Sequence, residues 1–449
     1  MATSQTTPLP AAVQEPARVP APAVLSGGEA LVLAATVGVG LLAWAGLALA
    51  DAGRYGLAAA LGLAVPATAA VAAVAWWAGP RPRLVADRGG LAVLAGMALV
   101  AAVLFFPGFS YGVGKDPGIY VSHAIAIART GSTSLPDPVL DRSRVPRVEV
   151  MREDPVNRLP AIWIQHQDPG RVIVQFYHLW PALLASAFRL GGYTGLVNLT
   201  PLLGVLAVLA VTLAVRRAFG LVTAAVAGLL LATNMLEVWH AKYPSSETFA
   251  QLLVGGALLA VVLALQTRWR GAAGVAGLLL GVAYLARPDS LLLLLLAVAA
   301  GCVLLVAGRF DARAGWFAAG LAVTLPYGFL QAYVLARRYT LANHVPDLPM
   351  VMAVVVGGLV LALLTRRAAP GVGRWGVRLL ARRRVQLWVG GVAVGSATLL
   401  LVLGFLRPWL FGPVYAIVAG RRVRTYDEAS LIRLSWFLTV PGFALALAG

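Results

Sequence analysis

The side chains that could do chemistry are gathered in a few loops of this chain. Both lysines and all five histidines fall in loops predicted on one side of a membrane: Lys115, Lys242, His123, His166, His178, His240 and His344. These side chains exchange protons or bind anions readily. The apolar segments between the loops carry almost no ionisable groups. We therefore expect the function to reside at that membrane face.

The strongest candidate for a catalytic group is Asp116, in the motif Lys115-Asp116-Pro117-Gly118-Ile119-Tyr120. Asp before Pro is typical of a helix start, so Asp116 could serve only as an N-cap. A cap carboxylate at the mouth of a membrane protein could equally act as a general base. Glu153-Asp154 offers a second candidate, Asp154, although such a pair is more often a solvated loop charge.

A second group occupies the loop His240-Ala241-Lys242-Tyr243-Pro244-Ser245-Ser246-Glu247. Either serine could cap the following helix, and Glu247 in its first turn would favour the positive end of the helix dipole. Lys242 beside Tyr243 suits a phosphate held at the level of lipid headgroups. The alternative is a lysine that only extends to the membrane surface.

A third group is Arg287-Pro288-Asp289-Ser290. Asp289 could be a helix cap with Arg287 as its partner, or Arg287 could bind a phosphate or diphosphate through two hydrogen bonds. The histidines show no metal-ligand spacing and there is no cysteine pair, so a metal site is unsupported, although acids with His166 or His178 could assemble one in space.

Composition defines the class of protein that must position these groups. Of 449 residues, 60% are hydrophobic and 12% are charged, which is far outside the soluble globular range. The chain is therefore predicted to be an integral membrane protein. Its net charge of +18 is explained by membrane topology and not by nucleic acid, because no basic stripe interleaved with aromatic residues is present. The single Cys302 lies in an apolar run.

About twelve apolar runs are long enough to cross a membrane. They lie near 30–50, 57–78, 90–109, 195–214, 220–238, 249–266, 272–286, 290–307, 315–336, 349–365, 386–406 and 431–449. Residues 1–28, rich in proline and alanine, are predicted to be a disordered cytoplasmic tail before a membrane domain at 29–449. Because the chain stops inside its last apolar run, we expect that a C-terminal part is missing.

Arginine counts give the orientation. The short loops at 81–88, 216–217, 268–270, 309–313 and 366–384 are richer in arginine than the alternating loops, which predicts that they and the N-terminus are cytoplasmic. The loops at 110–175, 240–247 and 287–290 are then extracytoplasmic, on the outside of the cell membrane. The basic stretch 366–384 could also lie on anionic headgroups.

The 110–175 loop is long and acidic enough to be a folded insert. A short helix on the membrane surface is predicted from Asp116 to Gly131, and a β-hairpin from 162–166 and 172–176 around Asp168-Pro169-Gly170. The apolar segment 182–190 is too short to span and is predicted to be interfacial. The fold predicted is an all-α polytopic membrane protein with about twelve transmembrane helices, short interfacial helices and a small hairpin.

These motifs, with the segment Gln175-Phe176-Tyr177-His178-Leu179-Trp180-Pro181, resemble those of membrane glycosyltransferases of the GT-C fold, such as protein O-mannosyltransferases and aminoarabinose transferases. The likeness covers about residues 90–300. It implies a polyprenyl-phosphate-sugar donor, an inverting transfer and a catalytic role for Asp116. Pro117 stands where many members have a second acid, and two spans precede the helix that leads into the loop.

The chemistry implied needs a base for the acceptor hydroxyl and cations for the departing phosphate. Asp116 is expected to be the base, with Asp154 as the second candidate. Residues expected to bind substrate are Lys115, Tyr120, His178, Lys242, Tyr243, Glu247, Arg287 and Asp289. No cofactor or metal is required. The expected partners are the lipid donor, an unidentified glycan, lipid or protein acceptor and membrane lipids, with no nucleic acid.

Two alternatives stay open. A lipid or polyprenyl-sugar transporter or flippase would place ionisable groups or broken helices near the membrane midplane, where the predicted spans show none. A catalytically silent assembly subunit that only binds lipid would have the same sequence features as an enzyme.

Overall fold

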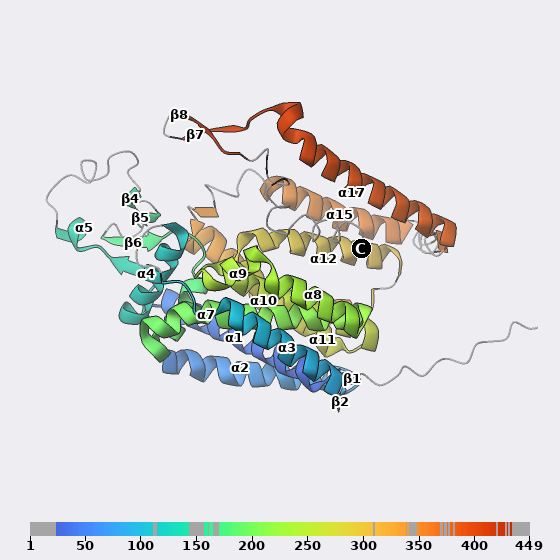
Figure 1. Cartoon of the computed structure of the whole chain (residues 1–449), viewed down its shortest axis with the longest axis horizontal. Coiled ribbons are helices and arrows are strands. Elements are labelled where there is room, and N and C mark those ends of the chain that lie inside the picture. Colours follow the sequence, from blue (N-terminus) through green and yellow to red (C-terminus); the bar gives the residue numbers. More distant parts are fainter. Residues whose placement is uncertain are drawn as a thin grey trace, which may run out of the picture.

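The chain folds into a bundle of long apolar helices with a mixed insert at one end, as the computed structural model shows (Figure 1). The structure describes residues 24–110, 115–142, 157–159, 161–164, 170–308, 310–337, 339–340, 348–368, 371, 375, 378–379, 382–418, 421–426, 429 and 432. Within them, seven helices are long and apolar enough to cross a membrane, or eight if one bent pair forms a single span. The protein is therefore an all-α polytopic membrane protein.

The seven segments are α1 (Gly27–Asp51), α2 (Leu57–Trp77), α3 (Arg88–Phe105), α7 (Leu179–Phe219), α10 (Ser246–Thr267), the 3-10 turn η1 (Pro288–Ser290) with α12 (Leu291–Val306), and α13 (Ala312–Leu330) with the π-helix η2 (Gln331–Leu335). The bent pair is α8 (Leu221–Thr233) and α9 (Met235–Lys242), which meet at 60°. Further apolar segments are α11 (Arg270–Ala286), α15 (Leu348–Ala368) and α17 (Arg383–Phe411). The expected span at 431–449 lies outside the described residues, apart from position 432, so the count of twelve stays a prediction.

The segment 182–190 differs from its prediction. It is the first arm of α7, which bends at Gly191 and Gly192, where Gly192 has a φ of 60°. Residues 179–187 of this arm are buried. An interfacial helix would leave one face to the headgroups, whereas this arm is enclosed by α1, α4 and α10.

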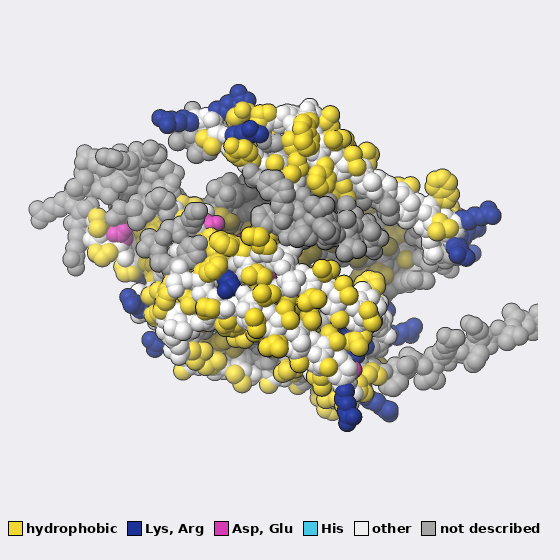
Figure 2. Space-filling view, viewed as in Figure 1, with side chains coloured by type: hydrophobic (Ala, Val, Ile, Leu, Met, Phe, Trp, Pro, Cys, Tyr) yellow, Lys and Arg dark blue, Asp and Glu magenta, His cyan; other side chains and the backbone are white. Residues whose placement is uncertain are grey.

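Small residues let the central helices approach closely. A side chain on Gly277 of α11 would meet the Phe317 carbonyl oxygen, and one on Gly320 of α13 would meet the Gly274 carbonyl oxygen, each at 2.0 Å. Glycine is therefore required at both positions for α11 and α13 to pack backbone to backbone, as is common in membrane bundles. On the face seen in Figure 2, hydrophobic side chains are spread over the side of the bundle, and most of the visible Lys and Arg side chains lie towards its ends.

The insert contains α4 (Lys115–Thr130), α5 (Pro138–Arg142) and a four-stranded sheet of order β3-β6-β5-β4. Its strands are β3 (Ser134–Pro136), β4 (Asn157–Leu159), β5 (Ile162–Ile164) and β6 (Arg171–Val174). The antiparallel pair β5–β6 occupies the place of the expected hairpin, in the register Trp163 to Ile173. One face of α4, including Val121, Ala124 and Ile127, is buried against α7, so this helix is part of the protein core.

The three candidate loops meet at the same end of the bundle, which we call the insert end. The Tyr120 hydroxyl of α4 lies 3.4 Å from the Ser246 hydroxyl of α10, which also accepts a hydrogen bond from Arg287. The opposite end, called the Glu29 end, is closed by the parallel pair β1 (Val24–Ser26) and β2 (Arg83–Val85). The remaining strands, β7 (Tyr415–Val418) and β8 (Arg421–Arg424), form a separate antiparallel hairpin.

Candidate functional site

Arg287 is the centre of the site at the insert end. It follows α11 at the point where η1 begins, and it contacts two carboxylates. Its Nη1 lies 2.5 Å from Glu247 Oε1, and its Nε lies 3.0 Å from Asp289 Oδ1. Nη1 is also 3.4 Å from the Ser246 hydroxyl. Burial lowers the pKa of Arg287, but Asp289 and Glu247 outweigh it and raise that pKa, so the guanidinium stays charged.

The helix α4 contributes Tyr120 and Asp116 to this end of the bundle. Tyr120 is buried and its hydroxyl pairs with Ser246, and burial raises its pKa. Asp116 lies four residues earlier in the first turn of α4, so the two side chains share one face of the helix. Its carboxylate is exposed. The helix begins at Lys115, one residue before the expected start, so Asp116 lies in its first turn.

Tyr339 is the third group near this cluster. Burial raises the pKa of Tyr339, Arg287 lowers it, and the carboxylates of Asp116 and Asp289 raise it. All three charged groups therefore lie within electrostatic reach of the Tyr339 hydroxyl. The site thus combines an exposed carboxylate, a guanidinium with two carboxylate partners and a phenol.

Two of the expected substrate-binding residues lie elsewhere. Lys242 Nζ is 3.2 Å from the Pro107 carbonyl oxygen and 5.6 Å from the centre of the Phe109 ring. Tyr243 packs on Trp239, with ring centres 5.7 Å apart. Both residues therefore lie against the end of α3, and within the described part of the chain Lys242 forms no ion pair.

Three expected residues remain. One of them is buried, and the side chains of the other two lie outside the described part of the chain. His178 is fully buried, and its Nε2 lies 3.0 Å from the Val174 carbonyl oxygen. The Lys115 side chain and the whole of Asp154 lie outside the described residues, as do His166 and His344.

A buried polar cluster behind the site was missed by the sequence analysis. Asp51, at the end of α1, accepts hydrogen bonds from the Thr133 hydroxyl at 2.8 Å, from the Tyr327 hydroxyl and from the Gln331 amide. It therefore joins α1 to the insert and to the π-helical end of α13. The sequence offered one signal for this cluster: Asp51 ends one apolar run and Gln331 lies within another.

Two histidines extend this cluster. Their rings are 4.9 Å apart, and His123 Nε2 lies 3.2 Å from the Thr133 carbonyl oxygen. Burial lowers the pKa of both, and His178 lowers that of His123 further, while Asp51 opposes the shift at His178. Both Nδ1 atoms are buried without a partner in the described part of the chain. Both rings are therefore neutral, with Nε2 carrying the proton.

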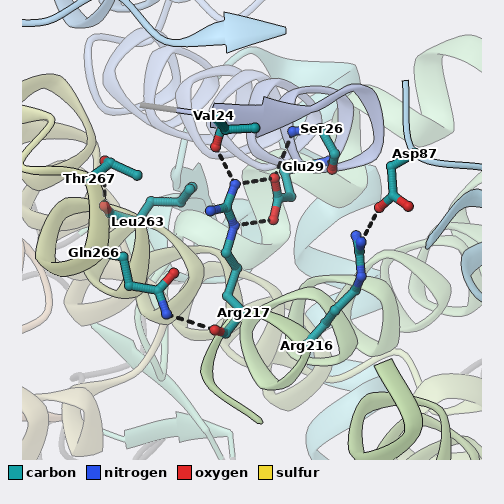
Figure 3. A network of polar contacts seen from close by, with 9 residues as sticks. All are labelled: Val24, Ser26, Glu29, Asp87, Arg216, Arg217, Leu263, Gln266 and Thr267. Atoms are coloured by element: carbon teal, nitrogen blue, oxygen red, sulfur yellow. Dashed lines mark hydrogen bonds and ion pairs between the residues drawn. The ribbon is translucent and has the colours of Figure 1, made fainter. Parts of the chain in front are cut away.

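A cavity of about 310 Å³ at the Glu29 end holds a second arginine network (Figure 3). Arg217 contacts Glu29 through Nε at 2.5 Å and Nη2 at 2.8 Å, and Arg216 pairs with Asp87. Gln266 donates to the Arg217 carbonyl oxygen at 2.6 Å. The ionised groups are paired with one another inside the protein, which is the arrangement expected of a structural tie.

No group of three or more histidine, cysteine or acidic side chains suited to a metal is found among the described residues. Comparisons of the chain with known protein families, with characterised proteins and with solved structures find no match.

Proposed function

We propose that this protein is an inverting glycosyltransferase of the GT-C type that transfers a sugar from a polyprenyl-phosphate donor at the extracytoplasmic face of the cell membrane. The observation that carries the proposal is the arrangement around Arg287. A guanidinium that can bind phosphate lies at the same bundle end as the exposed carboxylate of Asp116, with Tyr339 within electrostatic reach of both.

The reaction divides between these groups. Asp116 takes the proton of the acceptor hydroxyl as the new bond to the sugar C1 forms. The bond between C1 and the phosphate oxygen breaks, and Arg287 stabilises the charge left on the lipid phosphate. The activated donor supplies the energy, so no cofactor is required. The acceptor is a glycan, lipid or protein hydroxyl.

To bind a phosphate, Arg287 must use N–H groups that donate to carboxylates in this structure. Asp289 is the partner to be displaced, because its side chain is 57% exposed, whereas that of Glu247 is 39% exposed. Glu247, at the start of α10, keeps the guanidinium in place through Nη1. Lys242, near the end of α3, acts on the lipid headgroup at a distance from the reacting carbon.

The test of the base is Asp116→Asn. An amide cannot accept the proton, so transfer from a polyprenyl-phosphate sugar should fall by about 100- to 10,000-fold. The matched control is Asp137→Asn, in which the changed side chain caps α5 of the same insert through the Val139 amide at 2.9 Å. Equal transfer by the Asp116 variant and the parent would contradict the assignment and move the candidate base to Asp154.

Orientation is tested by labelling cysteines from outside the cell in a Cys302→Ser background. Val139 in the insert is 49% exposed and Leu84 at the Glu29 end is 60% exposed, so both positions are open to reagent. Cysteine at 139 should react and cysteine at 84 should not. The reverse result would place the insert and its site in the cytoplasm.

One observation favours a carrier as the second candidate. Asp51 is a carboxylate buried at the end of a membrane helix, and no basic side chain pairs with it among the described residues. Ionisable groups enclosed in a membrane bundle often mark ion or substrate pathways. Purified protein in liposomes separates the candidates: movement of a polyprenyl-phosphate sugar across the bilayer without transfer indicates a carrier, and donor binding with neither activity indicates a silent subunit.

A further inference from the structure

Four aromatic rings pack against one another in a row near Arg287. Phe176 lies between Tyr120 and Tyr339, with ring centres 5.0 Å and 5.3 Å away, and Tyr339 is 6.1 Å from Tyr177. Tyr120 and Tyr177 are buried, at 8% and 3% exposure, and support the other two. Phe176 and Tyr339 are only partly buried. We call these two partly exposed rings the aromatic platform.

The backbone places Phe176 in an unusual conformation. Its φ is 78°, in the left-handed region that bulky residues rarely adopt. The preceding Gln175 amide donates to the Ala161 carbonyl oxygen at 2.8 Å, and Ala161 is itself left-handed with a φ of 63°. The sheet thus turns sharply between β6 and α7 and directs the Phe176 ring between Tyr120 and Tyr339. Backbone strain of this kind clusters at active sites, ligand clamps and switch regions.

Charged groups border the platform. Arg287 donates to the Ser246 hydroxyl at 3.4 Å, and that hydroxyl lies 3.4 Å from the hydroxyl of Tyr120, whose ring packs on Phe176. Asp289 pairs with Arg287 at 3.0 Å, and Asp116 lies one turn before Tyr120 on α4. A ligand on the platform would therefore meet an apolar π face, hydrogen-bond acceptors and a phosphate-binding cation within one site. A purely hydrocarbon ligand would gain nothing from the two carboxylates.

A phosphate-linked sugar has the matching chemistry. One face of a pyranose ring consists of C–H groups whose slight positive charge suits the negative face of an aromatic ring. The hydroxyl groups at the ring edge donate to carboxylates, and the anomeric phosphate binds a guanidinium. We infer that Phe176 and Tyr339 form the subsite for the sugar ring of a lipid-phosphate-linked hexopyranose, an inference that rests on the proposed function.

Two probes test the subsite: polyprenyl phosphate and polyprenyl-phosphate mannose, each titrated against the purified full chain in nanodiscs. The parent should bind the mannose-bearing probe more tightly. Phe176→Leu keeps an apolar side chain but removes the ring, so it should lose about tenfold in affinity for that probe and little for bare polyprenyl phosphate. Tyr339→Leu should behave in the same way, and Tyr339→Phe should retain most of the binding.

The matched control is Phe329→Leu, which removes a ring 5.6 Å from Tyr284 and outside the platform. It should leave both affinities unchanged. Thermal stability is measured for each variant, and the Tyr339 pair carries the test if Phe176→Leu does not fold.

The outcomes separate this inference from the proposed function. Equal losses for both probes would show that the rings hold the lipid chain and would overturn the sugar subsite. A parent that binds both probes without preference would also overturn it, while leaving the phosphate site in place. A parent that binds neither probe would overturn the proposed function itself.

Discussion

The two ends of the bundle use the same chemical pair, an arginine with a carboxylate, in opposite ways. At the Glu29 end, the Arg217 and Glu29 side chains are 18% and 2% exposed, and Glu29 also forms a capping box with Ser26 (Figure 3). At the insert end, Arg287 pairs with Asp289, whose side chain is 57% exposed. The two arginines differ in the burial and the hydrogen bonds of their carboxylate partners, and not in the types of residue involved.

Only one of the two arginines can exchange its partner. Glu29 accepts from Arg217 and from the Ser26 amide, so removing Arg217 leaves the buried carboxylate without its countercharge. Asp289 can turn to water at little cost, because exposed ion pairs contribute about 0–1 kcal/mol. Arg287 can therefore accept another anion, whereas Arg217 holds α1 to α7.

The largest effect is expected from Arg217→Met. This change leaves the buried Glu29 carboxylate unpaired and should lower the free energy of unfolding by about 3–5 kcal/mol. Sugar transfer per folded molecule should stay unchanged, because Arg217 lies at the other end of the bundle. Chemical denaturation in detergent, followed by the transfer assay on the folded fraction, measures both quantities.

Arg313→Met is the matched control at the same end. Its carboxylate partner Asp311 is 46% exposed, and Arg313 also donates to the Ala264 carbonyl oxygen at 3.1 Å. No buried charge is left unpaired, so the loss should be about 1 kcal/mol. Equal losses for the two variants would remove the distinction between buried and exposed pairs.

A smaller effect is expected from Asp51→Asn. The carboxylate of Asp51 accepts from Thr133, Tyr327 and Gln331, whereas an amide has one oxygen and turns an N–H group towards these donors. Leaving one donor unsatisfied should lower the free energy of unfolding by about 1–3 kcal/mol. The same denaturation experiment measures it. An unchanged stability would show that the cluster does not fasten the insert to α13.

Acid should weaken the same cluster. The pKa values of His123 and His178 are lowered by burial, so below about pH 6.5 the unfolded chain binds protons that the folded chain does not. The contribution of these neutral histidines to the free energy of unfolding is therefore fully present above that pH. It falls as the pH drops, by up to about 1.4 kcal/mol per pH unit for each histidine. Thermal unfolding between pH 7.5 and 5 should show this slope, and His123→Gln should flatten it. A rise in stability on acidification would contradict this account of the two buried histidines.

Local patterns predicted much of the insert and little of its packing. Gly131 follows the last residue of α4 with a φ of 77°, as expected after a helix end. The strands β5 and β6 lie at 162–164 and 171–174, where a hairpin was predicted. Hydrophobic periodicity and turn residues determine these features over a few positions. The predicted meeting of the three loops at the same end also holds, because alternation of apolar spans fixes the end to which each loop belongs.

The missed features depend on contacts between distant residues. The partners of Asp51 lie 82, 276 and 280 positions away, so no local pattern could reveal them. Lys242 is four residues from Ser246, yet it lies against the end of α3. The reason is that α9 bends 60° from α8 and packs beside α3. Proximity in the sequence was a poor guide wherever a bent helix redirected a side chain.

The smallest effect tests the exchangeable partner of Arg287 directly. Asp289→Ala removes the carboxylate that a phosphate must displace, so bare polyprenyl phosphate should bind up to about fivefold more tightly, the equivalent of a surface pair worth about 1 kcal/mol. Stability should change by less than that amount. Asp311→Ala, which removes the carboxylate partner of Arg313 at the other end, should leave the affinity unchanged. Weaker binding in the Asp289 variant would mean that this carboxylate orients the guanidinium for its ligand and does not compete with it, and the contrast between the two ends would then lie in burial alone.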